Sequence, residues 1–231
     1  MTTMKTYLDI EEVEALEKAA QYLRDRLLIR MLCRTGCRVS EALGLSVDDV
    51  DFATGTVRIV HLKASMKLHC PQCGGRLSRS ARFCPGCGGI VEQTVAEARE
   101  QRRLRTLPVD RETLQLLREY LEQGGAISRN GRRLLFGINR HRAWQIVRDC
   151  AQRAGLGHLV NPETGRRHHV SPHRLRDAFA VNAVKKDDSG DGLRLLQEHL
   201  GHQSIVTTMR YRKLSGEEQR QWYERLWNRG A

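Results

Sequence analysis

The sequence predicts a mixed fold that is mainly α-helical, with a small antiparallel β-hairpin and a cysteine-rich insertion at its tip. Three observations lead to this prediction. Much of the chain carries apolar residues at helical spacing, the segments TVRIVHLK and RRLRTLPV read as strands, and two identical C-P-x-C motifs stand between them. With 231 residues, of which 40% are hydrophobic, the chain is long enough to bury a proper core.

The first half of the chain contains helices followed by the two strands. Helical spacing runs over residues 9 to 33, and Gly36 follows as a C-cap. A short helix is expected around VSEALGL, and a strand follows with Val57 and Ile59 on one face. The second strand ends at Pro108, and it is expected to pair with the first as a hairpin.

The second half is expected to be helical, with polar connections. Asp110 is predicted to cap a helix that turns Leu114, Leu117 and Leu121 inward. The remaining expected elements are a loop at 124 to 131, a helix at about 140 to 154, a basic loop at 157 to 170, a helix opened by Ser171-Pro172, a helix from 192, and a last helix from 215.

The composition points to a polyanionic partner. Lys and Arg number 39 against 27 Asp and Glu, a formal net charge of +12, which favours nucleic acid ahead of a membrane surface. No stretch approaches the roughly 18 apolar residues that span a bilayer, and the N-terminus lacks a signal-peptide pattern. We therefore expect a cytoplasmic protein, where reducing conditions favour cysteine pairs as metal ligands.

Residues 67 to 92 are predicted to be a zinc ribbon inserted in the hairpin. Cys70 pairs with Cys73 and Cys84 with Cys87, each pair separated by two residues. Two such pairs supply the four soft ligands that zinc binds tetrahedrally, and four thiolates leave no position for water. The predicted zinc is therefore structural. Disulfides or a redox dithiol are the alternatives.

Two other regions carry candidate catalytic residues. The first is RTGCRVSEALGL with Arg38, and the second is SPHRLRDAFAV followed by HLGHQSIVTTMRYRK. The second region holds His173, Arg176, His202 and Tyr211. Each residue alone is typical of a surface charge, a cap or half-buried core. Together, their order and spacing resemble the tyrosine recombinase (phage integrase) family over about residues 20 to 214.

The resemblance implies a helical tyrosine-recombinase catalytic domain that cleaves and rejoins double-stranded DNA as a site-specific recombinase. Arg38 and Arg176 would hold the phosphate oxygens, because guanidinium forks bind them bidentately and stay charged. Tyr211 would attack the phosphorus, giving a 3′-phosphotyrosyl bond and a free 5′-hydroxyl. The covalent bond conserves the energy of the phosphodiester, so no nucleotide cofactor is expected.

The resemblance also implies supporting roles. His173 would assist proton transfer at the tyrosine, and His202 would hydrogen-bond a phosphate oxygen. The family's lysine, which protonates the leaving 5′-oxygen, corresponds to Lys63, with Lys67 as the alternative. Asp177 stands where many relatives carry a second histidine, a position expected to be dispensable. Glu41 is interpreted as a buried partner of Arg38, or as purely structural.

The resemblance also predicts partners. Residues 1 to 231 would form the catalytic domain without the family's N-terminal core-binding domain, and a protein partner could replace that missing half of the DNA clamp. The zinc ribbon, with its arginines, is expected to contact DNA, the alternatives being a protein partner or a cap on the hairpin. A homo-tetramer on DNA would form through the last helix, and core packing is the alternative use of its apolar stripe. The residues concerned are Arg76, Arg79, Arg82, Arg102, Arg103 and Arg105 in the ribbon region, and Trp222, Tyr223, Leu226 and Trp227 in the helix.

Two other functions remain open at this point. A topoisomerase-like enzyme would use the same chemistry on one duplex as a monomer. A non-enzymatic, zinc-bearing DNA-binding protein would need only the basic surface, but the complete set of six catalytic residues argues against it.

Overall fold

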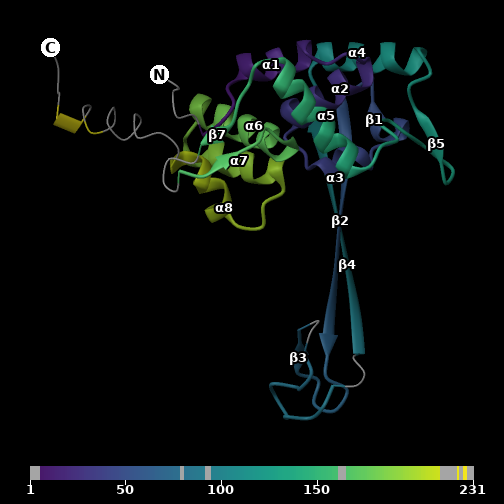
Figure 1. The fold of residues 1–231 in the computed structure, drawn as a ribbon, viewed down its shortest axis with the longest axis vertical. Helices are drawn as coiled ribbons and strands as arrows, with labels where there is room; N and C mark the ends of the chain where they lie inside the picture. Colours follow the sequence, from purple (N-terminus) through teal and green to yellow (C-terminus); the bar gives the residue numbers. More distant parts are fainter. Residues whose placement is uncertain are drawn as a thin grey trace. The chain divides into compact units, whose positions relative to one another are not determined.

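The computed structural model describes residues 6–78, 81–91, 95–160 and 165–213, together with Tyr223, Leu226 and Trp227. Within the two long strands, only the backbone is described for residues 61–67 and 95–103. The chain divides into two compact units, drawn in Figure 1. Unit 1 comprises Met1–Ile59 and Arg105–Ala231, and unit 2 comprises Val60–Leu104.

Unit 1 contains the described helices. They are α1 (Ile10–Lys18), α2 (Leu23–Thr35), α3 (Val39–Leu43), α4 (Arg111–Glu122), α5 (Arg140–Arg153), α6 (Pro172–Lys186), α7 (Gly190–Leu200) and α8 (Ile205–Met209), with 3₁₀ turns η1 (Val47–Asp49) and η2 (Arg210–Lys213). The helical stretch expected over residues 9 to 33 is two helices, with a break at residues 19 to 22. No Gly or Pro marks this break. It lets α1 and α2 pack against each other, a tertiary contact that overrides local propensity.

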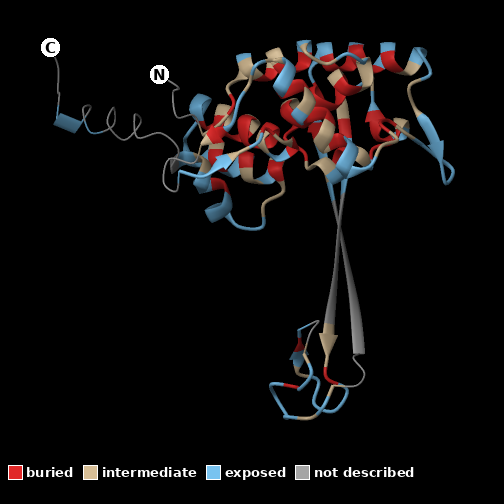
Figure 2. Cartoon of the chain, in the orientation of Figure 1, coloured by how far each residue is buried: buried red, intermediate tan, exposed pale blue. Residues whose placement is uncertain are grey.

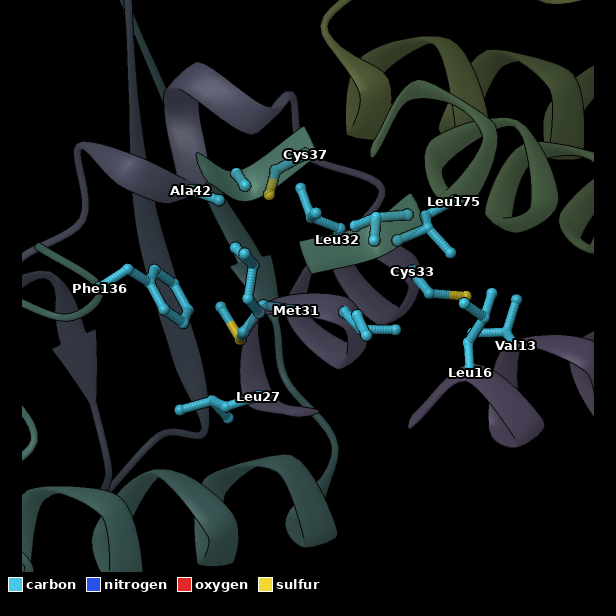
Figure 3. Packing of buried hydrophobic residues seen from close by; sticks show 14 of the residues in the cluster. Val13, Leu16, Leu27, Met31, Leu32, Cys33, Cys37, Ala42, Phe136 and Leu175 are labelled. Carbon is cyan, nitrogen blue, oxygen red and sulfur yellow. The ribbon is translucent and has the colours of Figure 1, made fainter. Parts of the chain in front are cut away.

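Helix α2 forms the centre of the core. Leu27, Leu28, Ile29, Met31 and Leu32 are fully buried, because α2 packs against α1, α4 and α6 on different sides. Figure 3 shows side chains of α2 between Phe136 on one side and Leu16 and Leu175 on the other. A central helix buried all round gives rigid support to both of its ends. Its C-terminal end leads directly into the candidate site.

The caps predicted at Gly36 and Asp110 are confirmed, and the cap predicted at Ser215 lies outside the described residues. Helix α2 ends at Gly36, whose φ of 58° is left-handed. Asp110 accepts a hydrogen bond from the Thr113 backbone N–H at the start of α4. Ser171 occupies the N-cap position of α6 but makes no side-chain cap hydrogen bond, and Pro172 stands in the first turn.

The main sheet is antiparallel. Its strands are β1 (Val50–Asp51), β2 (Thr56–His69), β3 (Arg76–Leu77) and β4 (Val95–Pro108), with β2 paired to each of the others. Val57 and Ile59 are fully buried, as their alternation predicts. The pairing of β2 with β4 confirms the predicted hairpin, whose strands are longer than the sequence indicated.

Two expected loops contain short hairpins. Strands β5 (Ile127–Arg129) and β6 (Arg132–Leu134) pair across Asn130-Gly131, whose φ angles are 50° and 73°. This is the positive-φ geometry that Asn-Gly favours in a two-residue turn. Strands β7 (Leu159–Val160) and β8 (Arg167–His168) pair within the expected loop at 157 to 170. Neither segment carries the long alternation from which a strand is predicted.

Unit 2 has almost no hydrophobic core in its described part. Its buried cluster consists of Cys70, Leu77 and Cys84, with Leu68, Ala81 and Val91 packed against it. Figure 2 shows the contrast with unit 1, where buried residues fill the interior. So few buried side chains are typical of small units that depend on a metal or a cross-link. Among the described residues, no helix has the length and apolar character required to cross a membrane.

Candidate active site and metal centre

Five of the six predicted catalytic side chains line one cavity of about 530 Å³ in unit 1. They are Arg38, His173, Arg176, His202 and Tyr211, which are contributed by segments far apart in the sequence. The sixth, Lys63, lies in β2, where its side chain and that of the alternative Lys67 are outside the description. Their assignment stays a prediction.

Arg38 is held by Glu41 at the start of α3. The buried Glu41 carboxylate accepts hydrogen bonds from the Arg38 backbone N–H at 2.8 Å and from Nη1 at 3.0 Å. Burial favours a raised pKa for Glu41, but the Arg38 N–H and the Arg105 and Arg38 guanidiniums outweigh it and hold the pKa below its ordinary value. The prediction that Glu41 is a buried partner of Arg38 is confirmed. The Arg38 side chain remains 35% exposed, so it can still reach a ligand.

Arg176 is buried in the wall of the same cavity, where it is 3% exposed. Its Nη1 donates to the Gly36 carbonyl at 2.6 Å and its Nη2 to the Leu200 carbonyl at 2.8 Å. Desolvation, followed by the neighbouring Arg38 charge, lowers the pKa of Arg176. Backbone carbonyls at the ends of α2 and α7 therefore fix this guanidinium in place.

His202 is oriented on both sides of its ring. Its Nε2 lies 3.0 Å from Arg176 Nη2 and its Nδ1 lies 2.9 Å from Thr208 Oγ1. Because a guanidinium only donates, Nε2 is the acceptor and Nδ1–H donates to Thr208. Burial, then the Arg176 charge, lowers the pKa of His202 to about 4, so the ring is neutral at pH 7. Thr208 was not predicted as a site residue, although it is the second threonine of the Thr-Thr pair in the motif.

Tyr211 is hydrogen-bonded to a residue that the sequence interpretation treated as dispensable. Its hydroxyl donates to Asp177 Oδ1 at 3.1 Å, and Arg174 Nη1 donates to the other carboxylate oxygen at 3.0 Å. Asp177 is 4% exposed. Burial of the phenol, together with the Asp177 charge, raises the pKa of Tyr211. Asp177 therefore contacts the predicted nucleophile, a contact that the sequence interpretation did not anticipate.

His173 lies one helical turn before Arg176 and also lines the cavity, as predicted. Its side chain is 71% exposed, and its Nε2 is 3.8 Å from Asp177 Oδ1. This separation exceeds hydrogen-bond distance. Of the two histidines in the cavity, His173 therefore has the more solvent-exposed side chain.

Arg105 is a site residue that was assigned incorrectly from the sequence. It was grouped with the DNA-contacting arginines around the ribbon, but its side chain is only 10% exposed. Its Nη2 donates to Glu41 at 2.8 Å, and its Nη1 donates to the Leu200 carbonyl at 2.6 Å. Arg105 therefore joins the carboxylate that holds Arg38 to the carbonyl that holds Arg176.

The cavity is strongly cationic. Among the residues that the structure describes, five arginines line it, and Asp177 is the only acidic residue in its lining. The arginines are Arg38, Arg140, Arg174, Arg176 and Arg210. Such a site can bind a phosphate and stabilise additional negative charge on its oxygens.

The four predicted metal ligands in unit 2 come together. The four Sγ atoms lie within 4.8 Å of one another, and the separations across the pairs are 3.8 Å for Cys70–Cys87 and 3.5 Å for Cys73–Cys84. A tetrahedron with Zn–S bonds of about 2.3 Å has edges of about 3.8 Å. The thiolate cluster can therefore hold a tetrahedral metal ion.

The two cysteine turns have matching backbone geometry. Cys70 N–H donates to the Gly75 carbonyl, and Cys84 N–H donates to the Gly89 carbonyl, each at 2.8 Å. In each turn this hydrogen bond starts at the first cysteine of the pair. The backbone N–H groups of Cys87 and Gly86 lower the pKa of the Cys84 thiol to about 6. These N–H groups favour the thiolate form that a metal requires.

Comparison with known proteins shows the family. The model of the phage integrase family matches residues 6–73 and 90–218, so the chain belongs to this family. The two matched ranges leave out residues 74–89, which include Cys84 and Cys87.

Among its relatives is the tyrosine recombinase XerD of Mycobacterium leprae, which is 31% identical over 201 residues, covering 82% of this chain and 48% of the relative. XerD of Bifidobacterium longum is 28% identical over 226 residues, covering 94% of this chain and 60% of the relative. The chain thus spans about half the length of the curated relatives that it matches.

Solved structures share the fold. The XerA recombinase aligns with a TM-score of 0.65 at 22% identity, covering 100% of this chain and 66% of that one. The XerH recombinase bound to its difH substrate aligns with a TM-score of 0.58 at 22% identity. The alignment covers 95% of this chain and 54% of the XerH chain. The catalytic domain of the bacteriophage HP1 integrase aligns with a TM-score of 0.52 at 17% identity. The alignment covers 97% of this chain and 95% of the integrase domain.

Proposed function

We propose that this protein is a site-specific DNA recombinase that cleaves and rejoins DNA strands through a covalent bond to Tyr211. The observation that carries the proposal is the convergence of Arg38, Arg176 and Tyr211 on one cationic cavity in unit 1. Family membership supports it, because the matched relatives are named tyrosine recombinases and the XerH structure contains DNA substrate.

The geometry suits phosphoryl transfer. Arg38 and Arg176 approach the cavity from different segments, so their guanidiniums can hold two oxygens of one phosphate. Donors fixed in advance at the place where charge develops supply much of the catalytic effect. Thr208 holds the His202 ring against Arg176, so His202 orients that guanidinium. His202 is also proposed to hydrogen-bond a phosphate oxygen. Lys63 is the proposed general acid for the leaving 5′-oxygen.

The test is a trap for the covalent intermediate. The full chain is incubated with a pool of nicked duplexes of randomised sequence, in which the cleaved strand loses a short fragment and cannot be rejoined. Covalent protein–DNA complexes are then recovered in detergent, and the attached peptide and DNA are identified. We expect an adduct at Tyr211 that Tyr211→Phe abolishes. Tyr22→Phe, at a tyrosine that is 63% exposed, is the matched control and should leave the adduct unchanged.

The same experiment separates the alternatives. A wild-type chain that binds DNA but forms no adduct under any condition would favour the non-enzymatic DNA-binding protein. An adduct that survives Tyr211→Phe would place the nucleophile elsewhere. A topoisomerase-like enzyme would form the adduct and relax a supercoiled plasmid, but it would not exchange strands between the two sites of one plasmid.

We propose that the four cysteines of unit 2 bind a zinc ion and that this ion stabilises the ribbon. The four-sulfur donor set, the Sγ separations and the minimal hydrophobic core of the unit support this assignment. Elemental analysis of the purified chain should find one zinc per protein. Cys84→Ser should lose the metal and increase proteolysis within residues 60 to 104. A Cys150→Ser control, outside the cluster, should retain the metal.

The proposed partners of the ribbon and of the last helix remain separate tests. In the ribbon, Arg76 and Arg82 are exposed, as a DNA contact requires, and the side chains of Arg79, Arg102 and Arg103 lie outside the described residues. Replacing Arg76 and Arg82 together should weaken DNA binding and reduce its salt dependence. A protein partner or a capping role for the ribbon predicts no change.

A homo-tetramer on DNA is proposed through the last helix. Tyr223, Leu226 and Trp227 are exposed, and Trp222 lies outside the described residues. Truncation after Arg212 should leave a DNA-bound monomer by light scattering, if this helix joins the subunits.

A further inference from the structure

The hydroxyl of Tyr211 faces a carboxylate in a cavity whose other described charged residues are arginines. We propose that Asp177 is the general base that takes the phenolic proton when Tyr211 attacks the phosphorus. The inference rests on the proposed function, and it moves to Asp177 the direct role that the family resemblance gives to His173.

The distance and orientation suit proton transfer. Tyr211 Oη donates to Asp177 Oδ1 at 3.1 Å, within the range at which a base removes a proton from its donor. Arg174 Nη1 holds Oδ2 at 3.0 Å, which fixes the carboxylate and leaves Oδ1 facing the phenol. Because Asp177 is buried, this geometry is set by packing and does not depend on a mobile surface side chain.

The other groups around the phenol are less suited to accept its proton. Both nitrogens of His202 are already engaged, Nε2 with Arg176 and Nδ1 with Thr208. His173 is largely exposed, and its Nε2 lies 3.8 Å from the same carboxylate oxygen. The other ionisable side chains in the cavity lining, besides the Cys37 thiol, are Tyr7, Arg38, Arg140, His173, Arg174, Arg176, His202 and Arg210.

The step balances without a further reactant. Tyr211 Oη forms the bond to phosphorus as its proton moves to Asp177 Oδ1, and the bond from phosphorus to the 5′-oxygen breaks. The 5′-oxygen takes a proton from the general acid, proposed as Lys63. In rejoining, the 5′-hydroxyl attacks the phosphorus and returns its proton to Lys63, the bond from phosphorus to the tyrosine oxygen breaks, and Asp177 returns its proton to that oxygen. A carboxylate accepts a hydroxyl proton in the same way in protein kinases.

Asp177 could instead serve only to restrain Tyr211, and its mutation would then change the cleavage rate in the opposite direction. The Asp177 carboxylate raises the pKa of Tyr211, so it would hold the tyrosine inactive if it served only as a restraint. Removing the charge would then speed cleavage at neutral pH. If Asp177 is the base, removing the charge slows cleavage. Asp177→Asn distinguishes the two because it preserves the size of the side chain and removes its ability to take a proton.

The experiment measures single-turnover cleavage of the nicked duplex recovered by the covalent trap, between pH 6 and pH 9. At pH 7, Asp177→Asn should cleave about 10² to 10⁴ times more slowly than the wild type, the usual contribution of a general base. Its rate should rise about tenfold per pH unit as ionised phenol replaces the missing base, since a phenol has a pKa near 10. Asp191→Asn, at an exposed aspartate of α7, is the charge-matched control and should match the wild type.

Asp177→His supplies a second, independent readout. An imidazole at this position can accept the proton only while it is neutral, so cleavage should persist near pH 8 and fall below about pH 6.5. The inference is overturned if Asp177→Asn cleaves as fast as, or faster than, the wild type at pH 7. It is also overturned if Asp177→His gains no acid limb. Absence of any wild-type adduct would refute the proposed function itself, which distinguishes the two failures.

Discussion

Replacing Arg105 with methionine tests whether a buried residue outside the predicted catalytic set supports both predicted catalytic arginines, Arg38 and Arg176. Arg105 makes an ion pair with Glu41, with side chains 10% and 1% exposed, and donates to the Leu200 carbonyl. Removing one partner of a buried pair costs about 3–5 kcal/mol. The lower end applies here, because Glu41 keeps its two bonds from Arg38 and Leu200 keeps its bond from Arg176. Methionine retains most of the volume, so we expect a loss of about 3 kcal/mol in unfolding free energy.

The assay is urea unfolding of the full chain followed by circular dichroism, since the described helices all lie in unit 1. Arg58→Met is the matched control. Arg58 pairs with Asp49 at 3.3 Å, but its side chain is 57% exposed, so its loss should cost no more than about 1 kcal/mol. Single-turnover cleavage by Arg105→Met should also fall, because Glu41 would then hold Arg38 without its second arginine. Equal unfolding midpoints and slopes for the two variants would refute the argument.

Three shorter predictions concern the same site. Gly36→Ala should cost about 2 kcal/mol by urea unfolding, because φ is 58° and the new Cβ would lie 2.6 Å from Phe179 Cδ1; a neutral effect would contradict this geometry. Glu41→Gln should cost about 3 kcal/mol at pH 7. The folded pKa of Glu41 is below its ordinary value of 4.5, so this difference should shrink as pH falls below that value, and a constant gap from pH 7 to 3 would argue against it. Thr208→Val should leave His202 Nδ1–H unpaired and slow cleavage more than it weakens DNA binding, as measured by single-turnover rates and gel shift.

Much of the site was predictable because local spacing determines it. His173 and Arg176 share a face of α6 because they are one turn apart, and Ser171-Pro172 begins the helix just before them. The two cysteine turns likewise form from contiguous residues, so their internal geometry follows from the repeated motif. The order of the remaining motifs then indicated the family. The family resemblance in turn implied that these motifs meet at one site.

Contacts between distant residues were not predictable from spacing. Asp177 and Tyr211 are 34 positions apart, and Arg105 and Glu41 are 64 apart. Neither pair has a sequence pattern of its own, so Asp177 was read as an unimportant departure and Arg105 as one surface charge among several. The hairpin at Asn130-Gly131 is a different case, since its turn signal was present in the sequence and was not used.

Arg105 also changes the physical interpretation of the Leu-Gly-His motif. Gly201 ends α7 with a φ of 67°, and the Leu200 carbonyl just before it accepts from both Arg105 and Arg176. A Cβ at position 201 would collide with the Arg105 guanidinium. The glycine is therefore required for two reasons, the left-handed backbone and the space that Arg105 occupies. It follows that this motif does more than present His202. It creates a shared acceptor for two arginines, one in the cavity wall and one on the strand that returns from unit 2.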